Sequence, residues 1–195
     1  MPISKATLIE RVRQAGVVGA GGAGFPTYAK IQGEIETVIV NGAECEPLLT
    51  VDVPLLTRKA EFLVAGLAGV VETLGAKIGI ITCKAKHLEA VRQLEGVLAG
   101  GTHEGRVILH LLDDFYPAGD EPILVQEVLG RVVPQGNIPL ALKCLVINVE
   151  TLYNMIRALA ESPVLTTRLT ITGAVANPMT VDVPVGTTYG DLLDL

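Results

Sequence analysis

A glycine-rich segment near the start of the chain limits the local fold more than any other feature. Residues 19–27 read Gly-Ala-Gly-Gly-Ala-Gly-Phe-Pro-Thr, with four glycines among the first six positions. Because glycine lacks a Cβ, this backbone can take positive φ angles and approach a flat or phosphorylated ligand closely. Pro26 follows, and its fixed φ suits the first turn of a helix. A glycine-rich turn that runs into a helix can hold an anion on backbone N–H groups.

The same glycines also fit G-x-G-x-x-G, the pattern of a dinucleotide-binding turn. That pattern requires a strand directly before the first glycine. Residues 4–15 instead place their apolar side chains at helical spacing, and only two valines separate this segment from Gly19. We therefore disfavour an ordinary Rossmann turn. A glycine-rich surface turn without a ligand remains the simpler alternative.

The composition excludes several classes of partner. The 195 residues carry a formal net charge of −6 and show no basic cluster with interleaved aromatic residues, so no nucleic acid partner is expected. No apolar run reaches the length of a membrane-spanning helix, and the first residues are amphipathic rather than signal-like. We therefore expect a cytoplasmic protein that meets a membrane only through its partners.

The cysteines and histidines show no metal-binding motif. Cys45, Cys83 and Cys144 are odd in number and far apart, which suits a reducing compartment better than a disulfide framework. No C-x-x-C pair is present, so the chain has no iron–sulfur or zinc motif of its own. We expect Cys83 and Cys144 to be core residues. No metal-ligand spacing connects the three histidines, which are His87, His103 and His110.

Aliphatic runs alternate with helical patterns along most of the chain. Strands are predicted at residues 37–40, 77–82, 107–112 and 145–148. Helices are predicted at residues 4–15, 54–74, 86–98, 122–129 and 151–160. Because the strands are almost continuously aliphatic, we predict an α/β fold with a largely parallel sheet and helices on both faces.

The pattern changes near residue 164. Two strands are predicted at residues 168–175 and 180–185, and a helix begins near residues 186–188. Two strands with one short helix are marginal alone, so we expect the chain to be a fragment cut inside a second small domain. The predicted domains are residues 1–163 and residues 164–195.

Three further motifs follow predicted strands, and α/β sheets bind their ligands at such strand ends. The first motif, residues 41–47, reads Asn-Gly-Ala-Glu-Cys-Glu-Pro, in which the amide and the acids can bond ribose hydroxyls. The second, residues 116–121, reads Tyr-Pro-Ala-Gly-Asp-Glu, and the third, residues 148–151, reads Asn-Val-Glu-Thr. We predict that all three belong to one ligand site.

Each of these motifs also has a purely structural interpretation. The first is equally well a solvated acidic turn. Asp120 precedes a predicted helix and is in position to be a plain N-cap. Asn148 ends a predicted strand shortly before Thr151, so the third motif is equally well a capped turn between a strand and a helix.

Taken together and in this order, the four motifs resemble those of a known family. They are similar to the flavin-binding, NADH-oxidising subunit of respiratory complex I, and more closely to the C subunit of the Rnf electron-transport complex. The same family includes the cobalamin reductase of microcompartments and the electron-transfer protein of proline reductase. The resemblance covers nearly the whole chain, and residues 169–195 resemble the start of the β-grasp soluble-ligand-binding domain (SLBB-like) of this family.

The resemblance implies a role for each motif. The glycine loop and Lys30 would wrap FMN and border the nicotinamide, and Phe25 would stack near NADH. The first motif would contact FMN or the nucleotide, the second would lie over the flavin, and the third would contact the ribityl phosphate. The implied cofactor-binding residues are Gly19, Gly21, Gly22, Gly24, Phe25, Lys30, Asn41, Glu44, Tyr116, Gly119, Asp120, Glu121, Asn148 and Thr151.

The chemistry implied by the resemblance is hydride transfer from NADH to FMN, followed by single-electron release to an iron–sulfur centre. The four-cysteine motifs of Rnf-like subunits are absent from this chain. Any 4Fe–4S clusters would therefore lie in sequence outside the chain or in other electron-transfer subunits. The resemblance also implies a location at the inner face of a membrane complex or inside a microcompartment.

The chain departs from the complex I pattern at three positions. It has Ala20 where the pattern has arginine, Ala43 where it has an acid, and Ile147 where it has a second asparagine. These losses of polar contacts favour a second interpretation, a non-catalytic docking module of the same fold that holds a corrinoid or another protein of the complex. The first interpretation, an FMN-binding NADH dehydrogenase module, accounts better for the glycine loop.

Overall fold

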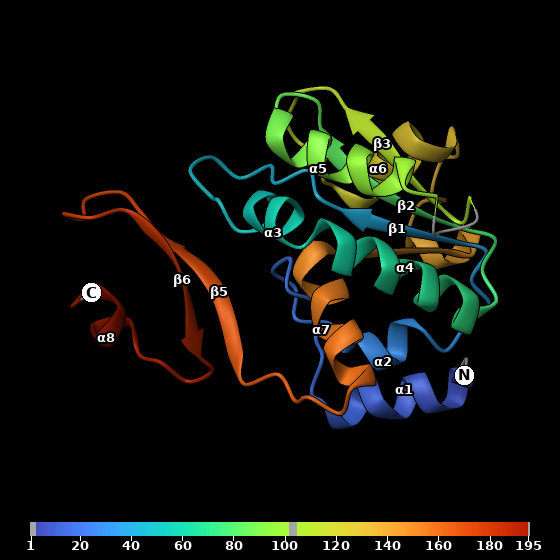
Figure 1. The fold of residues 1–195 in the computed structure, drawn as a ribbon, viewed down its shortest axis with the longest axis horizontal. Helices are drawn as coiled ribbons and strands as arrows, with labels where there is room; N and C mark the ends of the chain where they lie inside the picture. Colours follow the sequence, from blue (N-terminus) through green and yellow to red (C-terminus); the bar gives the residue numbers. More distant parts are fainter. Residues whose placement is uncertain (1–2, 102–104, 195) are drawn as a thin grey trace.

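The computed structural model describes residues 3–101 and 105–194. Its centre is a four-stranded, fully parallel sheet in the order β3-β2-β1-β4 (Figure 1). The strands are β1 (Thr37–Asn41), β2 (Ile78–Lys84), β3 (Val107–Leu112) and β4 (Cys144–Asn148). The parallel sheet predicted from the aliphatic runs is confirmed.

Helices cover both faces of this sheet. One face packs against α1 (Lys5–Gln14), α3 (Asp52–Arg58), α4 (Ala60–Leu74), α5 (Leu88–Ala99) and α7 (Val149–Leu159) in the larger core cluster. The opposite face packs against α6 (Glu121–Leu129) and the 3₁₀ helix η1 (Pro139–Leu142) in a smaller cluster. Successive strand residues point to opposite faces, so Val38 and Val40 join the first cluster and Ile39 the second.

Most predicted elements shift by one or two residues at their ends, and two of them differ more from the structure. The predicted helix at residues 54–74 is two helices, α3 and α4, because Lys59 leaves the helical region with φ −125°. The helix α3 begins at Asp52, so Pro54 lies in its first turn, where proline is tolerated. The first strand of the C-terminal pair ends at Ile171 rather than at residue 175, before Gly173 with φ +93°.

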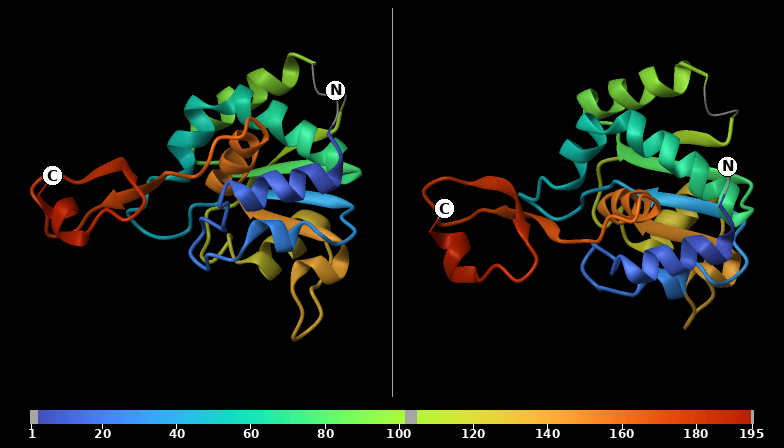
Figure 2. Two further views of the ribbon diagram at one scale, coloured as in Figure 1. Left: turned by 90° about the horizontal axis from the view of Figure 1, so that it is seen from below. Right: turned by 60° about the horizontal axis from the view of Figure 1, so that its bottom comes forward.

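The C-terminal residues form a separate antiparallel hairpin. The strands β5 (Thr166–Ile171) and β6 (Met179–Pro184) pair only with each other, and α8 (Tyr189–Leu193) follows them. All views show this hairpin beside the sheet domain rather than within it (Figures 1 and 2). The domain boundary at residues 163 and 164 and the β-grasp identity of the hairpin stay predictions.

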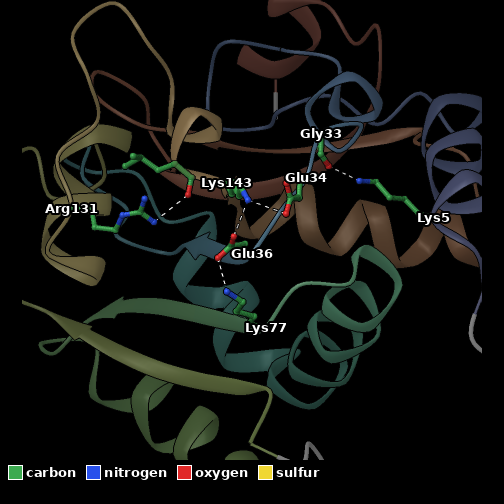
Figure 3. A network of polar contacts seen from close by, with 8 residues as sticks. Lys5, Gly33, Glu34, Glu36, Lys77, Arg131 and Lys143 are labelled. Atoms are coloured by element: carbon green, nitrogen blue, oxygen red, sulfur yellow. Dashed lines mark hydrogen bonds and ion pairs between the residues drawn. The ribbon is translucent and has the colours of Figure 1, made fainter.

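A network of ion pairs holds the edge of the sheet where the strands begin (Figure 3). Lys143 lies within 2.9 Å of Glu34 and 3.1 Å of Glu36, and Glu36 also lies 2.7 Å from Lys77. Hydrogen bonds from these two lysines lower the pKa of the Glu36 carboxyl. The residues come from the segments just before β1, β2 and β4, so the network ties the three strand starts together.

No helix in the described ranges is both long and apolar enough to cross a membrane.

Candidate functional site

The site lies at the opposite edge of the sheet, where the order of strands reverses. From β1 the chain adds β2 and β3 on one side, and it then returns to place β4 on the other side of β1. Asn41 and Asn148 end these two neighbouring strands and are register partners. Open α/β sheets bind ligands in the crevice outside such a switch point.

Two adjoining cavities occupy this crevice. The larger has a volume of about 720 Å³ and the smaller about 390 Å³. Gly21, Asn41, Gly119 and Asn148 line both, so the two cavities are halves of one cleft. Every residue that the sequence predicted for the site lines one of the halves, except Gly24, which lines neither.

The glycine loop forms one wall of the cleft and is closed at its base. Val18 and Pro26 form an antiparallel bridge, and the N–H of Gly19 donates to the carbonyl of Phe25 at 2.9 Å. Inside the loop, Gly22 (φ +116°) and Gly24 (φ +61°) adopt the left-handed region that only glycine occupies without strain. The loop therefore needs glycine at two positions for conformation alone.

The contacts of the loop correct two expectations. The helix after it, α2 (Thr27–Lys30), has only four residues, and Pro26 is its N-cap rather than its first residue. The helix that borders the loop is α7, because the N–H of Ala20 donates to Thr151 Oγ1 at 2.9 Å. The loop follows helix α1, so the Rossmann interpretation, which needs a strand there, is wrong.

Lys30 links the loop side of the cleft to the opposite wall. Its Nζ donates to Glu121 Oε1 at 2.7 Å and to the carbonyl of Val146 at 2.8 Å. The Lys30 side chain is mostly buried, at 16 % exposure. The ammonium is therefore held at the floor of the smaller cavity by α6 and β4.

The loop before α6 is clamped onto the end of β1. Asn41 Nδ2 donates to the carbonyl of Gly119 at 2.8 Å, and the N–H of Gly119 donates to Cys45 Sγ at 2.9 Å. A Cβ at position 119 would lie 3.2 Å from the Ala43 Cβ and from Cys45 Sγ. Because Gly119 has no side chain, the loop before α6 can lie close to the loop that follows β1, and Gly119 lines both cavities.

The Glu44 carboxylate caps the N-terminus of α3. It accepts hydrogen bonds from the N–H groups of Val51, of Asp52 at 2.9 Å and of Val53 at 3.2 Å. These groups form the N-terminus of α3, where a carboxylate also interacts favourably with the helix dipole. The solvated-turn interpretation is therefore wrong for Glu44, and its contact with a nucleotide stays a prediction.

The capping interpretations of the other two motifs are confirmed. Asp120 Oδ1 accepts from the N–H of Ile123 at 3.4 Å as the N-cap of α6. Asn148 Oδ1 accepts from the N–H of Glu150 at 2.8 Å as the N-cap of α7. Both residues also line the cleft, so capping and lining the site are not alternatives here.

Sequence reasoning missed Asp52, a buried acid in the wall of the larger cavity. It is 8 % exposed, and its Oδ2 accepts from Asn148 Nδ2 at 2.7 Å. Its Oδ1 is buried without a hydrogen-bond partner among the described residues. Burial raises the pKa of the Asp52 carboxyl to about 7, and the nearby charge of Glu44 acts in the same direction. An acid just before Val53-Pro54 was the available signal, since acids favour the first turn of a helix.

Arg168 was missed as well, and Glu150 belongs to the third motif but was not among the cofactor-binding residues; both line the larger cavity. Glu150 is 7 % exposed, and burial raises the pKa of its carboxyl. Its Oε1 accepts from the backbone N–H of Arg168 at 3.1 Å. The hairpin therefore touches the site through β5, which no local sequence pattern indicated.

No group of three or more potential metal ligands occurs among the described residues. Cys83 and Cys144 are fully buried, as predicted, and lie in the two core clusters on opposite sheet faces. Burial raises the pKa of both thiols to about 11. His103 lies outside the described residues.

Known proteins are similar to this chain over most of its length. Residues 12–157 match the family described as the Nuo51 FMN-binding domain. The chain is 44% identical over 190 residues to cobalamin reductase PduS of Citrobacter freundii, covering 97% of this chain and 41% of that protein. It is 33% identical over 189 residues to the C subunit of the Na⁺-translocating ferredoxin:NAD⁺ oxidoreductase complex of Acetobacterium woodii, covering 94% of this chain and 42% of that protein.

A solved structure has the same fold. The NAD⁺-reducing NiFe-hydrogenase in its H₂-reduced state superimposes with a TM-score of 0.82 at 26% identity, covering 97% of this chain and 38% of that one. The fold and the site define an α/β flavoprotein domain of the oxidoreductase type. The chain belongs to the Nuo51 FMN-binding domain family. It spans about two fifths of the length of the curated relatives described above.

Proposed function

We propose that the chain binds FMN in the cleft between β1 and β4 and oxidises NADH there, as a module of an electron-transfer complex. The observation that carries this proposal is the position of the cleft. The glycine loop, Asn41, Gly119 and Asn148 meet at the switch point of the sheet, around one cleft with two halves. A cleft with two halves fits a flavin that must meet a second nucleotide.

Three features of the cleft fit a bound FMN. Each half has a volume within the range of small-molecule sites, roughly 300–1,000 Å³. Gly21 and Gly119 present backbone without side chains to both halves. Asp52 lines the larger half, and its Oδ1 is buried without a partner in the described protein, so a ribityl hydroxyl that reached this atom would satisfy it.

The chain itself would bind, orient and shield the reacting groups. Asn41 and Asn148 have their amides fixed by Gly119 and Asp52, so they contribute rigid polar edges. Thr151 holds the glycine loop through Ala20, which keeps the loop amides in place. Lys30, fixed by Glu121, would place a positive charge beside the ring system and stabilise developing negative charge.

The residues that line both halves would hold FMN, which would supply hydride transfer from NADH and single-electron release. Phe25 is half-exposed in the lining of the smaller half and would pack against the dinucleotide. The electron acceptors would be 4Fe–4S centres outside this chain, because its three cysteines are dispersed and two are buried. Such a module would work in the cytoplasm, at the inner face of a membrane complex or inside a microcompartment. The relative named cobalamin reductase supports a corrinoid as one eventual acceptor.

Titration of the purified chain with FMN, followed by flavin fluorescence, tests the proposal. Gly21→Val would project a branched side chain toward Asn148 and into both halves, so we expect it to abolish saturable binding. Gly96→Val is the matched control, because a Cβ at this position in α5 meets nothing within 4 Å. The wild-type complex should then be reduced by NADH in a stopped-flow experiment.

Absence of FMN binding by a chain that circular dichroism shows to be folded would contradict the proposal. The non-catalytic docking module would then be the better explanation. Binding of FMN without reduction by NADH would retain the flavin site and exclude NADH as the donor.

A further inference from the structure

The β5–β6 hairpin forms one wall of the larger cavity. Arg168, Leu169 and Thr170 of β5 line this cavity. Hydrogen bonds anchor the hairpin at two places: the Arg168 N–H donates to Glu150, and Thr50 bonds with Thr170 and Thr180. The Thr50 N–H donates to Thr170 Oγ1 at 3.1 Å, and Thr50 Oγ1 lies 2.6 Å from Thr180 Oγ1. The hairpin therefore contributes residues to the site and is hydrogen-bonded to the sheet domain.

The charges around the larger cavity are unbalanced. Five carboxyl side chains line it, and they are Glu44, Glu46, Asp52, Asp120 and Glu150. Within the described part of the chain, Arg168 is the only lysine or arginine in the same lining. Electrostatics therefore favours a phosphate on the Arg168 side of this cavity over any other part of its wall.

The Arg168 side chain has free capacity to bind an anion. Its Nη2 donates to Asp182 Oδ2 at 2.8 Å, and Asp182 is the only hydrogen-bond acceptor of the guanidinium among the described residues. A guanidinium has five N–H donors in a planar fork, which matches two phosphate oxygens at once. Lys30, the lysine of the smaller cavity, already has its ammonium on Glu121 and Val146.

We propose that Arg168 binds a phosphate group of the nucleotide held in the larger cavity. This inference rests on the proposed function, since it assumes a nucleotide in the cleft. Two nucleotides offer the same chemistry: FMN has a terminal phosphate, and NADH has a pyrophosphate. The hairpin then contributes directly to nucleotide affinity, although it lies outside the sheet domain.

Affinities for ligands with and without phosphate test the inference. FMN is compared with riboflavin, and NAD⁺ with nicotinamide riboside on the FMN-loaded protein, both by calorimetry. The preference of each pair is the ratio of the two affinities. In Arg168→Gln we expect one of these two ratios to fall about tenfold or more, as for a lost charge-assisted hydrogen bond. Arg168→Lys keeps the charge and should restore part of that preference.

The control is Arg58→Gln. Arg58 lines a small outer cavity together with Arg168 and Asp182 but does not line the larger cavity, so its loss removes a nearby charge without removing the contact. The Arg168 N–H still reaches Glu150 in every Arg168 variant, so hairpin docking is retained. A lower FMN preference assigns Arg168 to the flavin phosphate, and a lower NAD⁺ preference assigns it to the pyrophosphate.

Unchanged preferences for both pairs, or an equal effect of Arg58→Gln, would overturn the inference while leaving the proposed function intact. A folded wild-type chain that binds neither FMN nor NAD⁺ would overturn the proposed function and the inference together.

Discussion

The amide of Asn148 donates to the buried carboxyl of Asp52 at 2.7 Å, and this bond joins the first residue of α3 to the N-cap of α7. The same amide presents its oxygen to the N–H of Glu150. Asn148 is therefore held from two sides while it lines both halves of the cleft. The acid that orients it has a pKa raised to about 7, chiefly by its burial.

Asp52→Asn should remove a pH dependence of stability. Burial raises the pKa of Asp52 from its ordinary value of 3.8 to about 7, so the folded state binds the proton more tightly than the unfolded state. The stability linked to Asp52 is therefore complete below about pH 4 and is lost as the pH rises through about 7. Urea unfolding at pH 5 and at pH 8 measures this effect. Between these two pH values, the free energy of unfolding should fall less in Asp52→Asn than in the wild type.

The asparagine variant is informative because it keeps the shape and an oxygen that can accept from Asn148. Glu150 also has a raised pKa, so part of the pH dependence should survive in the variant. Identical pH dependence in the wild type and in Asp52→Asn would show that Asp52 ionises normally in the folded protein.

Thr151→Val should loosen the glycine loop without opening a cavity. Thr151 is 2 % exposed and its hydroxyl accepts from the Ala20 N–H, whereas valine has the same shape and no acceptor. We expect a loss of about 1 kcal/mol in stability and faster hydrogen exchange of the Ala20 amide. Hydrogen–deuterium exchange with mass spectrometry of the loop peptide measures the second effect.

Thr151→Ser keeps the hydroxyl and serves as the matched control, so its loop peptide should stay protected. Equal exchange in the valine and serine variants would mean that the loop is held by its own closure at Gly19 and Phe25.

Gly119→Ala should weaken FMN binding more than it affects folding. The new Cβ would lie 3.2 Å from the Ala43 Cβ and from Cys45 Sγ and 3.3 Å from Asn41 Oδ1, so the two loops must separate by a few tenths of an ångström. We expect a destabilisation of about 1 kcal/mol and a clear loss of FMN affinity. Thermal unfolding and flavin titration measure the two effects separately.

Gly96→Ala supplies the contrast for this variant. Position 96 is an exposed site in α5 where a Cβ meets nothing, so alanine should stabilise the helix by roughly 0.5–1 kcal/mol. Unchanged FMN affinity in Gly119→Ala would mean that the close approach of the two loops is not needed for the flavin.

The fold was largely predictable because aliphatic strands and amphipathic helices carry local periodicity. The break at Lys59 was not, since neither glycine nor proline marks it and α3 is shifted by a cap that Glu44 supplies from outside the helix. Two of the predicted motifs converge because they end the neighbouring strands β1 and β4, and the motif after β3 is hydrogen-bonded onto the end of β1 through Gly119. Asp52 and Arg168 reach the same cleft through tertiary contacts, the first from a helix start and the second from the hairpin. The sequence marks Asp52 as a residue of a first helical turn, but no local pattern brings either residue to the cleft.

The antiparallel bridge between Val18 and Pro26 turns the glycine loop into a closed ring of fixed length. No irregular segment beside the bridge could absorb a residue inserted between Val18 and Pro26. The loop itself would have to extend toward Thr151 or toward the solvent. Lengthening the loop would therefore change the shape of the cleft at once, whereas an added residue between α1 and Val17 would leave the ring as it is.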